Sequence, residues 1–145
     1  MPDSLKVEHQ ELHGELAAAT QLPGRTGEAA QKVAALLHEH FESEEEFALP
    51  PLGLLVPLTS GVEPSDARDV VAMTDRLKAD LPRMLNEHKA IVAALEQLVS
   101  AGKAEGHPQA LAFADKLKLH AQNEEQVLYP AALLVGEYLK LKFPR

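Results

Sequence analysis

A histidine followed four residues later by a glutamate occurs twice in this chain, and the two copies lie eighty residues apart. The first copy is His40 with Glu44, and the second is His120 with Glu124. A second glutamate follows each copy directly, and a proline stands ten residues after each histidine. Because residues four apart lie on one face of an α-helix, each copy points an imidazole and a carboxylate in the same direction.

Apolar residues at helical spacing predict that this direction is inward. They precede and follow both motifs and make an amphipathic stripe that continues through the His and Glu positions: Val33, Leu37 and Phe47 in the first copy, and Phe113, Leu117 and Val127 in the second. A buried carboxylate is costly unless a positive charge compensates it. A His–Glu ion pair on each helix is one explanation. Two matching sites in one chain favour a shared metal instead.

Composition excludes several other kinds of site. The 145-residue chain has no cysteine, which removes disulfides, thiolate zinc sites, iron–sulfur clusters and thiol nucleophiles. Seven histidines are then the main nitrogen ligands. A net charge of −8 argues against nucleic acid and anionic membranes as partners. The polar N-terminus and the lack of a long apolar run predict a cytoplasmic location.

The periodicity predicts an all-α fold, in one domain over residues 1–145. We expect an antiparallel up-down four-helix bundle, with an extra helical extension before the third helix and a C-terminal helical tail. The expected helical ranges are 4–21, 28–48, 65–101, 108–129 and 131–140. At Pro82 the third stretch either kinks or begins a new segment with Asp80 as its cap.

The segment 50–58 is apolar but interrupted by proline and glycine. We interpret it as a loop that folds over one end of the bundle and covers the core. The alternative is an exposed apolar patch that supports a homodimer.

A wider repeat connects the first and third helices. Glu8-His9 matches Glu87-His88 at an offset of 79 residues. The chain therefore resembles two helical hairpins of one type, over about residues 4–50 and 83–130. Duplication of this kind places equivalent side chains around a pseudo-twofold axis, so four histidines and two glutamates should meet at one level of the core.

The chemistry of this ligand set favours two metal ions. Two carboxylates shared between metals, with imidazoles at the outer positions, suit iron best and manganese second. A single tetrahedral zinc ion would need fewer ligands, and magnesium or calcium would prefer oxygen to imidazole. Ferritin-like bundles place the glutamate first, at spacing three, whereas this chain places the histidine first, at spacing four.

Taken together, the motifs resemble those of the hemerythrin-like (HHE cation-binding) family over nearly the whole chain. The matching pieces are Glu8-His9-x-x-Leu12, His40-Phe41-x-x-Glu44-Glu45 with Pro50, Glu87-His88-x-x-Ile91, and His120-x-x-x-Glu124-Glu125 with Tyr129-Pro130. The resemblance implies two iron ions (Fe²⁺/Fe³⁺, oxo- or hydroxo-bridged), for which manganese or zinc can substitute. It also implies that His9, His40, His88 and His120 are terminal ligands and that Glu44 and Glu124 are bridges.

One departure from the respiratory members concerns His13. In the respiratory members that this chain resembles, the third helix has the pattern His-x-x-x-His. Here the first helix has that pattern, with His9 and His13, and on the third helix Val92 stands four residues after His88. We therefore expect one metal to bind His9, His13 and His40, and the other to bind His88 and His120 with an open position beside Val92. The alternative for His13 is a surface histidine or one that supports a ligand.

The resemblance implies a protein that binds or senses O₂ or NO, and we expect no catalytic residues. The alternatives are an enzyme that reduces peroxide, O₂ or NO at the same centre, an iron-buffering protein, and a scaffold that no longer binds metal.

Overall fold

The computed structural model describes residues 1–144, and all regular elements in that range are helical. The long helices are α1 (Asp3–Thr20), α2 (Gly24–Ser43), α4 (Ala67–Glu105), α5 (Pro108–Asn123) and α6 (Tyr129–Lys142). The short elements are the π-helical turns η1 (Glu44–Ala48) and η3 (Glu124–Leu128), the 3₁₀ turn η2 (Pro50–Leu54) and α3 (Leu55–Thr59). None of the described helices combines the length and the apolar composition needed to cross a bilayer.

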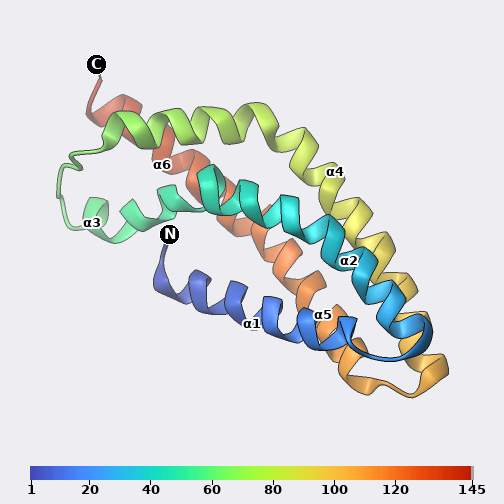
Figure 1. The fold of residues 1–145 in the computed structure, drawn as a ribbon. Coiled ribbons are helices and arrows are strands. Elements are labelled where there is room, and N and C mark those ends of the chain that lie inside the picture. Colours follow the sequence, from blue (N-terminus) through green and yellow to red (C-terminus); the bar gives the residue numbers. More distant parts are fainter. Residues whose placement is uncertain (145) are drawn as a thin grey trace.

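Helices α1, α2, α5 and the second half of α4 form an antiparallel four-helix bundle, so the predicted fold class is confirmed (Figure 1). The α1–α2 and α4–α5 turns lie at the same end of the bundle in Figure 1. Glu105, the last residue of α4, joins these turns because its carboxylate accepts hydrogen bonds from the backbone N–H groups of Arg25 and Thr26 at the start of α2.

Helix α4 passes through Pro82 without a break, so Asp80 does not cap a new helix. Figure 1 shows that α4 bends along its length, as expected where a proline removes a helical hydrogen bond. The Asp80 carboxylate instead accepts a hydrogen bond from Arg83 at 3.2 Å. Helix α2 begins at Gly24, four residues earlier than predicted, because the turn after α1 is shorter than its Pro and Gly content suggests.

The predicted extension and tail pack against each other. The first part of α4 contacts α6 through a small apolar cluster that includes Val70, Val135 and Leu139. Gly136 permits this close approach, because a Cβ atom there would lie 2.0 Å from the Thr74 hydroxyl oxygen. The C-terminal tail is therefore an integral part of the fold.

Segment 50–58 is helical rather than the loop that we expected. Pro51 and Leu52 are buried and cover the end of the core, as predicted. Leu55 and Val56, by contrast, are 40 % and 75 % exposed. A groove of about 370 Å³ runs between α3 and α6 and is mainly apolar in its lining. The homodimer through this segment stays a prediction.

The four bundle histidines lie in a layer between two apolar clusters. The cluster toward the α1–α2 turn contains Leu12, Leu37, Ile91 and Leu117. The other cluster contains Leu5, Phe47, Met84 and Tyr129. His9 lies between Leu5 and Leu12 on α1, and His88 lies between Met84 and Ile91 on α4, so members of the two clusters stand on either side of the polar layer and keep it from water.

Candidate metal centre

Each His-x-x-x-Glu motif ends an α-helix, and its glutamate begins a π-helical turn. In the first copy the Leu49 N–H donates to the Glu44 carbonyl oxygen, five residues back, at 2.9 Å. The widened turn shifts the face that the following residues present. Phe47 is buried, but Val127, its counterpart in the repeat, is 53 % exposed, so the prediction that Val127 continues the core stripe was wrong. π-Turns occur frequently at functional sites.

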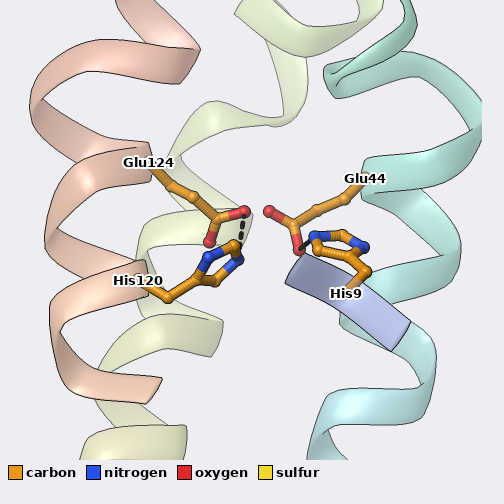
Figure 2. Close-up of side chains that lie close together, drawn as sticks. All are labelled: His9, Glu44, His120 and Glu124. Atoms are coloured by element: carbon orange, nitrogen blue, oxygen red, sulfur yellow. Dashed lines mark ion pairs between the residues drawn. The ribbon is translucent and has the colours of Figure 1, made fainter. Parts of the chain in front are cut away.

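The first group of candidate ligands consists of His9, Glu44, His120 and Glu124, which come from four different helical segments and point toward one another (Figure 2). His9 Nε2 lies 3.9 Å from Glu44 Oε1. His120 Nε2 lies 3.3 Å from Glu124 Oε2. All four side chains are at most 4 % exposed. This group has the two imidazoles and two carboxylates that a divalent or trivalent ion can accept.

The second group consists of His40, His88 and the same two glutamates. His40 Nε2 lies 3.6 Å from Glu44 Oε1, and His88 Nε2 lies 3.2 Å from Glu124 Oε1. Glu124 therefore directs one oxygen to each group, and Glu44 Oε1 lies between His9 and His40. Both glutamates therefore belong to both candidate ligand groups.

A further carboxylate contacts the Nδ1 atom of each of the four imidazoles. Glu87 accepts from His40 Nδ1, and Glu125 accepts from His88 Nδ1, both at 2.9 Å. The two remaining pairs are His9 with Glu45 and His120 with Glu8. An acceptor at Nδ1 places the proton there and leaves Nε2 free to bind a metal.

These pairs follow the pseudo-twofold repeat of the sequence. Glu8 contacts His120 as Glu87 contacts His40, and Glu45 contacts His9 as Glu125 contacts His88. The sequence analysis assigned no role of this kind to Glu8 or Glu87. The position of Glu8 and Glu87, each directly before a histidine on the first helix of its hairpin, was the available signal.

Burial keeps the histidines neutral, which favours metal binding, but it also favours the protonated form of Glu44, which opposes metal binding. Loss of solvent lowers the pKa of His40 to about 4, although the Glu87 carboxylate partly offsets this effect. Burial also lowers the pKa values of His9 and His88, so these imidazoles are neutral near pH 7. For Glu44 burial raises the pKa to about 8 in the absence of metal. A cation between the carboxylates would remove this penalty.

Four buried ligand atoms have no hydrogen-bond partner among the described residues: His9 Nε2, Glu44 Oε1, His120 Nε2 and Glu124 Oε2. Each belongs to the group in Figure 2, and each faces the other three residues of that group. A buried polar atom without a partner costs about 1–3 kcal/mol, so four at one point require an explanation. A bound cation satisfies all four, and the residues present fit such an ion.

Six of the seven predicted ligands come together, and His13 does not. Its side chain is exposed and contacts the edge of the Phe41 ring, with 4.8 Å between ring centroids. It also lines a surface hollow of about 350 Å³ that reaches His9. The histidines also pair differently from our expectation: His9 lies with His120, and His40 lies with His88. The reason is that facing imidazoles come from the two hairpins rather than from one.

Tyr129 also reaches the site, although it was not among the predicted ligands. Its hydroxyl donates to Glu44 Oε2 at 2.8 Å and lies 3.3 Å from Nε2 of both His40 and His88. The side chain is 1 % exposed, and its ring stacks on His88. Burial, followed by the nearby Glu44 carboxylate, raises the pKa of this phenol above its usual range. The tyrosine directly follows the second π-turn, which aims it at the site.

The fold and the buried His/Glu cluster together define a metal-binding four-helix bundle. The family model for the hemerythrin HHE cation-binding domain matches residues 1–132. The chain therefore belongs to this family, and the relationship inferred from the motifs is confirmed. Searches among curated proteins and among solved structures gave no match.

Proposed function

We propose that this protein holds two iron ions between its hairpins and binds or senses O₂ or NO there. The observation that carries the proposal is the pair of overlapping ligand groups that share Glu44 and Glu124. His9 and His120 would hold one ion, and His40 and His88 would hold the other. When bound, the ions supply a redox-active centre that can coordinate a diatomic ligand. Imidazole with carboxylate suits iron, and manganese or zinc can substitute.

The surroundings support a small neutral ligand. The layer lies between two apolar clusters, and apart from the ligands and their supporting carboxylates the residues next to it are mainly apolar. Such surroundings favour an uncharged diatomic over a charged substrate. The four outer glutamates hold the imidazoles in position and keep their protons on Nδ1. A cytoplasmic location stays a prediction.

The test is a cycle of reduction and oxygen exposure. Protein purified with iron is reduced without oxygen, and O₂ or NO is then admitted while the visible spectrum is recorded. A stable band that disappears when the gas is removed supports carriage or sensing. Irreversible oxidation with turnover of peroxide, O₂ or NO would instead support the redox enzyme. Uptake and release of iron without a gas response would support iron buffering, and no iron uptake would contradict all three.

A further inference from the structure

The two candidate metal positions are not equivalent, although the repeat matches their histidines and glutamates. The difference lies at the residue nine positions after the motif histidine, which is Leu49 in the first hairpin and Tyr129 in the second. Both side chains are buried, at 0 % and 1 % exposure. One copy thus contributes an apolar side chain at this point and the other contributes a phenol.

The phenol oxygen is surrounded by ligand atoms of one position. It lies 2.8 Å from Glu44 Oε2 and 3.3 Å from both His40 Nε2 and His88 Nε2. The two imidazole nitrogens are themselves 2.8 Å apart. The hydroxyl therefore belongs to the same set of converging donor atoms as the predicted ligands.

On this geometry, and resting on the proposed function, we propose that Tyr129 is an additional ligand of the ion held by His40 and His88. Phenolate is a hard oxygen donor and suits ferric iron. As the Fe³⁺–O bond forms, the phenol O–H bond breaks and its proton is released to water, with no electron transferred. The His40–His88 position then has one more protein ligand than the His9–His120 position.

The consequence is that the external ligand is directed to the other ion. Phe41 stacks on His9 with 4.5 Å between ring centroids, and the repeat counterpart of Tyr129 is the buried Leu49, which has no side-chain donor atom. The surface hollow that is lined by His9 and His13 approaches this same position from outside. This arrangement replaces our expectation of an open position beside Val92.

The experiment compares the wild type with Tyr129→Phe and Tyr138→Phe after loading with iron and oxidation with ferricyanide. Tyr138 is the only other tyrosine, is 43 % exposed and provides the matched control. The wild type and Tyr138→Phe should each hold two irons per chain and show a phenolate-to-Fe³⁺ charge-transfer band. Resonance Raman excitation in that band should enhance tyrosine ring modes, and Tyr129→Phe should lose both signals.

The wild-type measurement decides the matter even if Tyr129→Phe does not fold. Two irons without a tyrosine-enhanced band in the wild type would overturn this inference and leave the proposed function intact. Tyrosine modes that persist in Tyr129→Phe would also overturn it. A wild-type protein that takes up no iron would refute both proposals.

Discussion

The two hairpins of this bundle agree in every histidine and glutamate of the two candidate ligand groups, and they differ in the residues that surround those groups. His9, His40, Glu44 and their counterparts are matched, as are the four glutamates behind the imidazoles. By contrast, Phe41 corresponds to Ala121 and Leu49 to Tyr129. The comparison suggests that the symmetric part holds the metals and that the asymmetric part decides how each ion meets an external ligand.

Removing a shared glutamate should have the largest effect. Because Glu44 belongs to both ligand groups, Glu44→Gln should reduce bound iron from two ions to less than one per chain. Plasma emission analysis of the purified variant measures this directly. Glu46→Gln is the control, since that side chain is 63 % exposed and pairs with Arg76. Full iron content in Glu44→Gln would contradict the claim that Glu44 is a ligand shared by the two metal positions.

The pairing of histidines across the hairpins predicts a smaller, position-specific loss. His88→Ala should remove the ion that His40 and His88 share and leave the other, so iron content should fall to about half. His13→Ala should retain both ions, because its exposed ring lies outside both groups. Metal analysis of the two variants prepared in parallel separates these results. An equal loss of iron from both variants would indicate that His13 is a ligand.

The outer carboxylates allow a direct test of the pseudo-twofold symmetry. Glu87→Gln and its repeat counterpart Glu8→Gln should each weaken metal affinity by about 10–100-fold, because each leaves one imidazole without its charged acceptor. Competition with a chelator measures the affinity. The exposed Glu96→Gln should match the wild type. Unchanged affinity in either variant would contradict the proposed role of the carboxylate that contacts its imidazole.

The metal-free and metal-loaded states should respond oppositely to pH, with a modest magnitude. Burial raises the folded-state pKa of Glu44 from 4.5 to about 8, so folding without metal binds a proton. The contribution of Glu44 to the stability of the metal-free protein should then fall as pH rises from 6.5 to 8, by roughly 1–2 kcal/mol. Burial lowers the pKa values of His9, His40 and His88, so just above pH 6.5 the unfolded chain still binds more protons at these groups than the folded chain does, and they offset part of this fall.

Urea denaturation at several pH values measures this slope. Bound metal should reverse it, because metal binding requires deprotonated ligands. In the metal-free protein the stability of the wild type relative to Glu44→Gln should fall over this interval, since glutamine does not titrate in this range. A stability difference between the wild type and Glu44→Gln that stays constant between pH 6.5 and 8 would show that Glu44 is ionised in the folded state.

The position of the site along the bundle and the identity of most of its residues could be predicted from the sequence, because helical periodicity and the repeat are patterns within the sequence itself. The apolar stripe through Leu37 and Leu117 placed both motifs in the core, and burial of these residues confirms it. The pairing of histidines was not predictable in this way, since it depends on the rotation of one helix against another. The contact of Tyr129 with the site was also not predictable, because the orientation of its side chain depends on a π-turn, and no residue pattern in the sequence indicates that turn.

The central claim is that two cations sit between Glu44 and Glu124. Anomalous diffraction at the iron edge from crystals of the iron-loaded protein tests it most directly. The account predicts two anomalous peaks, one between His9 and His120 and the other between His40 and His88. No peak within the bundle at saturating iron, with the two glutamates facing each other alone, would contradict it.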